Sequence, residues 1–91
     1  MQLAEGYLVK EIADSYVLIP VGQNVMDYRN IISTNKTGNF ILNKLEEDFT
    51  YDELFIAVCT EYEASEQEKE LVKQDLDEFL TRLREKKLLC E

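Results

Sequence analysis

Two short apolar runs near the start of the chain have the pattern of neighbouring β-strands. The first, GYLVKEI, covers residues 6–12, and the second, SYVLIPV, covers residues 15–21; both are rich in β-branched and aromatic residues. Only two residues separate them, which is the spacing of a hairpin. The second run is apolar on both faces, so it suits the central strand of a small sheet, and Pro20 limits it at its far end.

A third apolar run follows the loop GQNVMD at residues 22–27. This run, YRNIIST, covers residues 28–34 and completes a meander of three short strands. It lies directly before a turn and the start of a helical pattern. The third strand would therefore end the sheet, and its outer edge is either an ordinary edge or a surface to which another strand can pair.

Apolar residues then recur at helical spacing in three consecutive stretches. Asn35 is a good N-cap for the first helix, and capping boxes open the second (Thr50 with Glu53) and the third (Ser65 with Glu68). The helices are expected at residues 36–46, 51–62 and 66–87, with apolar stripes made by Phe40, Ile41, Leu42 and Leu45; by Tyr51, Leu54, Phe55, Val58 and Tyr62; and by Leu71, Val72, Leu76, Phe79, Leu80 and Leu83.

Strands followed by helices indicate an α+β fold rather than alternating βα units. A three-stranded sheet needs cover on one face, and three amphipathic helices can supply it. With 91 residues the chain is expected to form a single domain, residues 1–91. We therefore predict a three-stranded antiparallel sheet followed by a three-helix bundle.

The charge of the chain argues against a polyanionic partner. Nineteen acidic residues face ten basic ones, for a net charge of −9. Binding to nucleic acid depends on Lys and Arg side chains that neutralise phosphates, and this chain has few of them. The sequence begins without the basic and apolar pattern of a signal peptide and has no apolar run long enough to span a membrane, so a cytoplasmic location is expected.

The residues that most often carry catalysis or bind metals are scarce. The chain has no histidine, which removes the commonest general base and the commonest metal ligand. Cys59 lies in an apolar helical stretch and is expected in the core, whereas Cys90 is expected to be exposed. The acidic segment EEDFTYDE, at 46–53, lacks the glycine and the ligand spacing of an EF-hand loop. The sequence thus predicts no enzyme, no metal site and no cofactor.

Three segments together resemble the PqqD family, whose small domains are also called RiPP recognition elements. They are LIPVG at the end of the second strand, IISTNKTGNFILNKL across the third strand and first helix, and DLDEFLTRLREKKLL in the third helix. Their order and spacing carry the resemblance, which extends over residues 3–90. The chain departs from the pattern at Lys87, where the family often has a glycine before the closing leucines.

The resemblance implies a winged-helix-like fold and a non-catalytic role. Members of the family bind the leader segment of a ribosomally made precursor peptide and present the peptide to a modifying enzyme, often a radical S-adenosylmethionine (SAM) protein. The leader adds as a strand to the sheet edge, between the third strand and the third helix. Carried to this sequence, the groove is lined by Arg29, Asn30, Ile31, Ile32, Ser33 and Thr34 on the strand and by Asp75, Phe79 and Arg82 on the helix.

Two alternatives remain open from the sequence. A winged helix also occurs in DNA-binding regulators, but the second helix here contains Asp52, Glu53 and Glu61 and no Lys or Arg. A structural subunit or homodimer without a peptide ligand would use the apolar stripe of the third helix in its interface. Within the groove, Arg82 could instead pair locally with Glu78, four residues earlier on the same helix.

Overall fold

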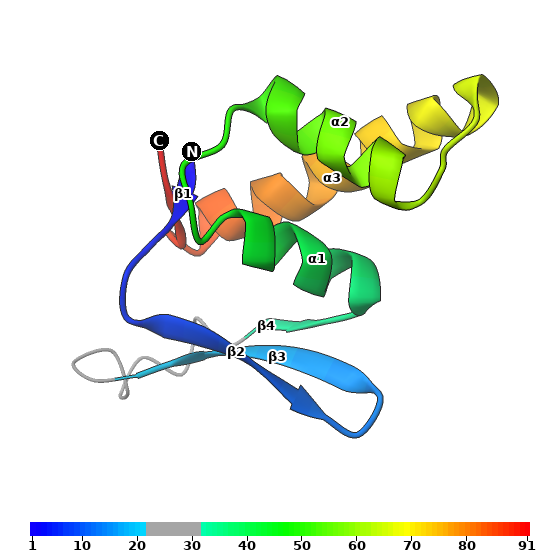
Figure 1. The fold of residues 1–91 in the computed structure, drawn as a ribbon. Helices are drawn as coiled ribbons and strands as arrows, with labels where there is room; N and C mark the ends of the chain where they lie inside the picture. The colour runs from blue at the N-terminus through cyan, green and yellow to red at the C-terminus, as the bar shows by residue number, and fades with distance from the viewer. Residues whose placement is uncertain (22–31) are drawn as a thin grey trace.

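The computed structural model describes residues 1–21 and 32–91, and in these residues the three strands of the main sheet precede the three helices as predicted (Figure 1). The loop predicted at 22–27 and the residues 28–31 of the predicted third strand lie outside the described residues. The elements are β1 (Gln2–Leu3), β2 (Tyr7–Ile12), β3 (Ser15–Pro20), β4 (Ile32–Thr34), α1 (Lys36–Lys44), α2 (Tyr51–Glu61), α3 (Glu66–Glu85) and β5 (Leu89–Cys90).

The sheet has the order β2-β3-β4 and is antiparallel throughout. A two-residue connection joins β2 to β3, with Ile12 opposite Ser15, so the predicted hairpin is confirmed. Ala13 in this turn has φ of 55°, which is a conformation that tight hairpin turns require. Strand β3 lies in the centre and ends at Pro20, as its apolar faces and the proline predicted.

The three helices begin where the capping residues predicted. The Asn35 side chain accepts a hydrogen bond from the Gly38 N–H at 3.0 Å. Both capping boxes form, and at α2 the Thr50 hydroxyl accepts from the Glu53 N–H at 3.1 Å while the Glu53 carboxylate accepts from the Thr50 N–H at 2.9 Å. These side chains satisfy backbone donors that the first helical turn leaves without partners. Each helix ends one or two residues before the predicted position.

The end of α3 forms a Schellman motif around an unusual residue. The Leu88 N–H donates to the Leu83 carbonyl at 2.9 Å, and the Lys87 N–H donates to the Arg84 carbonyl at 3.0 Å. Lys87 occupies the left-handed position of this motif, with φ of 59°. Glycine is usual at this position because it has no Cβ, so the departure noted at Lys87 falls where glycine would relieve strain.

The core lies between the sheet and the helices, where Leu18 and Ile32 belong to one buried cluster with apolar side chains of all three helices. Cys59 is buried, as predicted, and Cys90 is exposed. Two residues of the predicted stripes are not in the core: Leu71 is 58% exposed and Tyr62 is 45% exposed. Leu71 is five residues from Leu76, which places it well around the helix from the buried face, and Tyr62 follows the last residue of α2.

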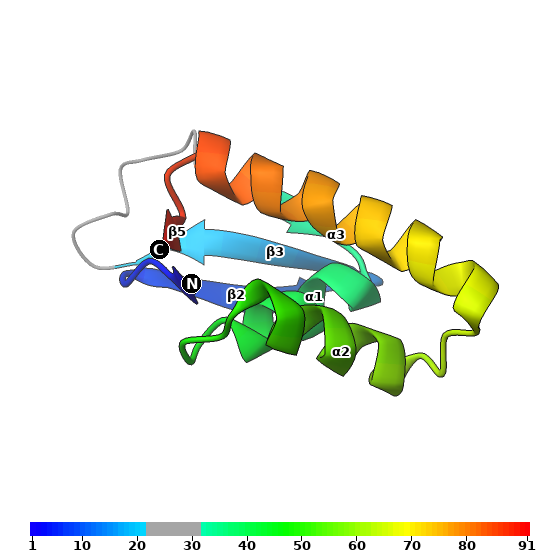
Figure 2. The same cartoon turned by 90° about the horizontal axis from the view of Figure 1, so that it is seen from above.

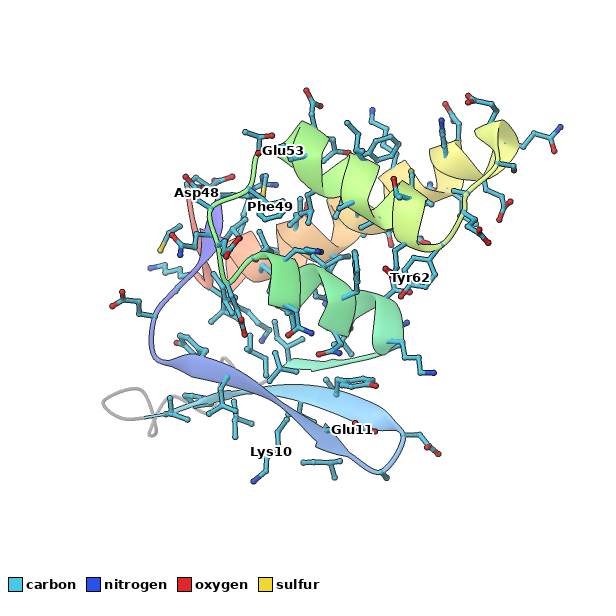
Figure 3. The ribbon with its side chains drawn as sticks, viewed as in Figure 1. Lys10, Glu11, Asp48, Phe49, Glu53 and Tyr62 are labelled. Carbon is cyan, nitrogen blue, oxygen red and sulfur yellow. The ribbon has the colours of Figure 1, made fainter. Side chains whose placement is uncertain are left out.

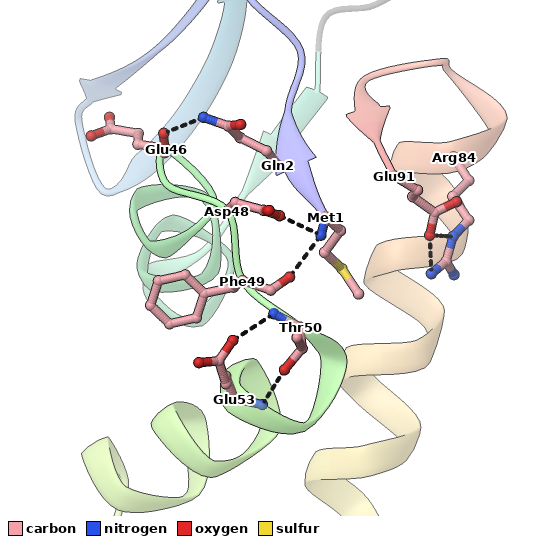
Figure 4. Close-up of polar contacts among 9 residues, drawn as sticks. All are labelled: Met1, Gln2, Glu46, Asp48, Phe49, Thr50, Glu53, Arg84 and Glu91. Carbon is pink, nitrogen blue, oxygen red and sulfur yellow. Dashed lines mark hydrogen bonds and ion pairs between the residues drawn. The ribbon is translucent and has the colours of Figure 1, made fainter.

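A second, two-stranded sheet joins the two ends of the chain and was not predicted. Leu3 of β1 lies opposite Leu89 of β5. The Met1 ammonium donates to the Asp48 carboxylate and to the Phe49 carbonyl, both at 2.8 Å (Figure 4). Strands of two residues show no periodicity in a sequence, so the pattern could not reveal them.

Candidate functional site

A pocket of about 390 Å³ lies between the β4–α1 junction and α3. Figures 1 and 2 show α3 on the β4 side of the sheet, running in the direction opposite to β4. The end of β4 and the start of α1 therefore lie on one side of this pocket, and α3 lies on the other; we call the space along the pocket and the outer edge of β4 the groove. The lining of the pocket is made by Thr34, Asn35, Thr37, Gly38, Ile41, Val58, Tyr62, Val72, Asp75, Leu76, Glu78, Phe79 and Arg82.

The hydrogen bonds at the sheet edge follow from the strand register. In an antiparallel pair, the N–H and C=O of one residue face the same neighbouring strand, and successive residues alternate. The Val21 N–H donates to the Gly6 carbonyl at 2.8 Å, on the β2 side, and the two-residue hairpin places Val17 toward β2 as well. The next residue, Leu18, therefore faces β4.

This alternation identifies the outward residue of β4. Leu18 lies opposite Ile32, and Tyr16 lies opposite Thr34, so the backbone groups of Ile32 and Thr34 face β3. Ser33 lies opposite Val17 and is out of phase with them. Its N–H and C=O therefore point away from β3, to the outer edge of the sheet.

The start of α1 approaches β4 so closely that only glycine fits at position 38. A Cβ added to Gly38 would collide with the Thr34 hydroxyl oxygen and would lie 2.8 Å from the Thr34 Cβ. Both residues line the pocket. The structure thus explains two residues of the segment Asn-x-Thr-Gly. The asparagine caps α1, and the glycine allows α1 to pack closely against β4.

The floor of the pocket is apolar and one rim is charged. Ile41, Val58 and Leu76 are buried residues that reach the pocket from the three helices. Tyr62 is at the end of α2 (Figure 3). Its ring meets Phe40 of α1 edge-on, with 6.1 Å between the ring centroids. Such a surface offers apolar contact for a ligand as well as hydrogen bonds.

The charged rim consists of Asp75, Glu78 and Arg82, which are exposed on α3. The ion pairs found among the described residues join Met1 to Asp48, Lys69 to Glu66 and Arg84 to Glu91. None of these pairs uses a rim residue, so the local Glu78–Arg82 pair expected as an alternative is not formed. The three charges face the groove without a salt bridge to each other.

The structure brings together four of the residues predicted for the site. Thr34, Asp75, Phe79 and Arg82 all line the pocket. Ile32 is 1% exposed and belongs to the core beneath the strand rather than to the lining, while Ser33 is exposed and directs its backbone outward. The predicted residues Arg29, Asn30 and Ile31 lie outside the described residues.

Nine lining residues were not predicted for the site. The α3 residues could have been found by extending the helical period from Phe79 to Leu76 and Val72 and from Arg82 to Glu78, because residues three and four apart share a face. Asn35, Thr37 and Gly38 directly follow the third strand in the sequence, whereas the α2 residues required the tertiary structure, since nothing in the sequence relates them to that strand. The nine are Asn35, Thr37, Gly38, Ile41, Val58, Tyr62, Val72, Leu76 and Glu78.

The lining of the pocket combines polar, charged and apolar groups. It consists of hydroxyl, amide, carboxylate, guanidinium and apolar groups, with no cysteine and no histidine. Among residues 1–21 and 32–91, no group of three His, Cys, Asp or Glu side chains could hold a metal ion. In the same residues, no helix is both long enough and apolar enough to cross a membrane.

Comparisons with known proteins agree with this description. The model of a family described as "Coenzyme PQQ synthesis protein D (PqqD)" matches residues 15–89. A solved structure, "TbiB1 in Complex with the TbiA(beta) Leader Peptide", is similar with a TM-score of 0.71 and 27% sequence identity, over 98% of this chain and 94% of that chain. No match was found among curated proteins.

Proposed function

Because this chain belongs to the PqqD family, we propose that it binds the leader segment of a ribosomally made precursor peptide and has no catalytic activity of its own. The similar TbiB1 structure contains a leader peptide, which supports a peptide as the ligand. The leader adds as a strand to the outer edge of β4, in the groove between β4 and α3. Its side chains enter the pocket along α3.

The observation that carries this proposal is the outward direction of the Ser33 backbone beside the pocket. Strand addition requires free main-chain groups for affinity and neighbouring pockets for specificity. Here the edge strand supplies the first, and the lining of Thr34, Phe79 and Arg82 supplies the second. Ile32 anchors the strand from below, because its side chain is buried in the core.

The bound peptide is presented to a modifying enzyme, for which the family resemblance implies a radical SAM protein. A peptide that pairs with the outer edge of β4 through its leader segment leaves the remainder of its chain accessible. This domain then contributes binding energy and position, and the enzyme contributes the chemistry. A mixture of the domain, the precursor and the enzyme would show this as one complex in sedimentation.

The test titrates synthetic peptides, taken from any short reading frames that neighbour the gene for this chain, into the protein by calorimetry. We expect micromolar or tighter binding, on the order of −8 to −10 kcal/mol, with a negative heat-capacity change from apolar burial. Amide hydrogen exchange then locates the peptide: the Ser33 amide should become protected, whereas the Val9 and Glu11 amides at the opposite edge should not. The absence of binding at about 100 µM peptide would refute the proposal, and binding without Ser33 protection would refute strand addition.

A further inference from the structure

The rim of the groove carries charges of both signs in a fixed order along α3. Asp75 and Glu78 come first in the helix, and Arg82 follows. All three side chains line the same pocket, and none takes part in the ion pairs found among the described residues. A ligand in the groove therefore meets a negative end and a positive end.

The direction of α3 relates this order to the direction of a bound strand. β4 and α3 run in opposite directions (Figures 1 and 2). A peptide that pairs antiparallel with β4 consequently runs parallel to α3. Its residues would pass Asp75 and Glu78 first and Arg82 afterwards.

The spacing of the charges limits the spacing in the peptide. Arg82 is seven residues after Asp75, which corresponds to about 10 Å along the helix axis. A strand covers this distance in about three residues. Side chains on one face of a strand recur every second residue, so two peptide side chains that both face α3 must be two or four residues apart.

We propose that the groove selects peptides in which Lys or Arg precedes Asp or Glu by two or four residues. This inference rests on the proposed function, because it assumes an antiparallel strand on β4. The basic side chain lies at Asp75 and Glu78, and the acidic side chain lies at Arg82. The order of the two charges gives the groove a directional preference that apolar contacts alone do not supply.

A displayed library of random 12-residue peptides tests this charge order. Peptides are selected on the wild-type protein and counter-selected on Ser33→Pro, which removes the outward N–H. Among the peptides retained only by the wild type, we expect the basic-before-acidic order at spacings of two or four to exceed the reverse order severalfold. Exchanging the two charges within one selected peptide should weaken binding, by about two- to fivefold for each rim pair, in fluorescence polarisation.

A charge exchange on the protein supplies the reciprocal test. Asp75→Arg combined with Arg82→Asp keeps the net charge and reverses the rim, so it should prefer the charge-exchanged peptide. Glu70→Lys combined with Lys73→Glu is the matched control, because both residues are exposed on α3 and neither lines the pocket. The control should retain the wild-type preference.

The outcomes separate this inference from the proposed function. Selected peptides without any charge order, or an unchanged preference after the Asp75–Arg82 exchange, would overturn the charge order and leave peptide binding intact. An excess of the reverse order would show that the strand binds parallel to β4. If no peptide distinguishes the wild type from Ser33→Pro, strand addition itself fails, and the charge order fails with it.

Discussion

The two edge strands of the sheet, β2 and β4, differ in what surrounds them. Both pair with β3 on one side, and by the register Val9 and Glu11 of β2 direct their backbone groups outward as Ser33 of β4 does. β2 is twice as long as β4, with six residues against three. However, the pocket is lined by β4 and α3 and contains no residue of β2.

If the leader adds at β4 as proposed, outward hydrogen-bonding groups alone do not make a binding edge. Sheet edges commonly carry charged residues that discourage pairing with other strands, and Lys10 and Glu11 provide them on β2 (Figure 3). β4 combines a short outward edge with an adjacent helix, an apolar floor and a charged rim. The proposed peptide recognition is therefore assigned to the shorter strand, because the pocket lies at the end of that strand.

The largest expected contrast concerns the anchoring of the two strands. Ile32 in β4 is 1% exposed, whereas Ile12 in β2 is 55% exposed. Ile32→Ala should lower the free energy of unfolding by about 2–5 kcal/mol, because it leaves a cavity in the core. Ile12→Ala, the same chemical change, should cost less than about 1 kcal/mol. Urea unfolding measures both, and equal losses would show that β4 is not held by its buried side chain.

A second feature of β4 is the close packing of α1 against it at Gly38 and Thr34. Gly38→Ala places a methyl group against Thr34, and we expect a loss of about 1–3 kcal/mol through overpacking, despite the better helix propensity of alanine. Thermal unfolding measures the loss. In a Thr34→Ala background the hydroxyl and methyl groups are gone, so the same substitution should cost less. An equal cost in both backgrounds would place the strain elsewhere.

The sequence predicted those features of the fold that depend on residues close together in the chain. The hairpin, the three N-caps and the burial of Ile41 and Leu54 follow from turn length, capping residues and periodicity. The closeness of β4 to α3 could be expected only through the family resemblance, because contacts between distant segments leave no periodic trace in one sequence. For this reason Val58 and Tyr62, which line the pocket, were not predicted as site residues.

The direction of the edge backbone could not be predicted from the sequence either. It depends on the register of both strand pairs, and a shift of one residue would exchange inward and outward positions. The sequence showed two residues in the hairpin but could not fix the pairing of β3 with β4. The opposition of Val17 to Ser33 supplies that missing fact.

Proline substitutions compare the two edges directly. Ser33→Pro removes an outward N–H at β4 and should weaken leader binding about 2- to 12-fold, the equivalent of one hydrogen bond of 0.5–1.5 kcal/mol, while the melting temperature changes little. Glu11→Pro removes an outward N–H at β2 and should leave leader binding unchanged. Calorimetry measures the affinities, and scanning fluorimetry measures the melting temperatures.

An inward proline on β4 provides the control for this pair. The Thr34 N–H faces Tyr16 of β3, so Thr34→Pro should lower the melting temperature of the free protein. If Ser33→Pro destabilises the free protein as much as Thr34→Pro does, the Ser33 N–H is already bonded within the domain. If Glu11→Pro weakens leader binding as Ser33→Pro does, the two edges are equivalent and the groove is not the binding site.

The smallest effect is expected at Lys87, where stability can be raised without any change in the groove. Lys87 has φ of 59° in the Schellman motif of α3 and does not line the pocket. Lys87→Gly should stabilise the protein by up to about 1 kcal/mol, because glycine avoids the left-handed penalty but loses more entropy on folding. Lys87→Ala keeps that penalty and should not stabilise. Leader affinity should be the same in all three proteins by calorimetry. If the leader affinity rises with the melting temperature, binding depends on the overall stability of the domain. The groove would then not explain why the leader binds at β4 rather than at β2.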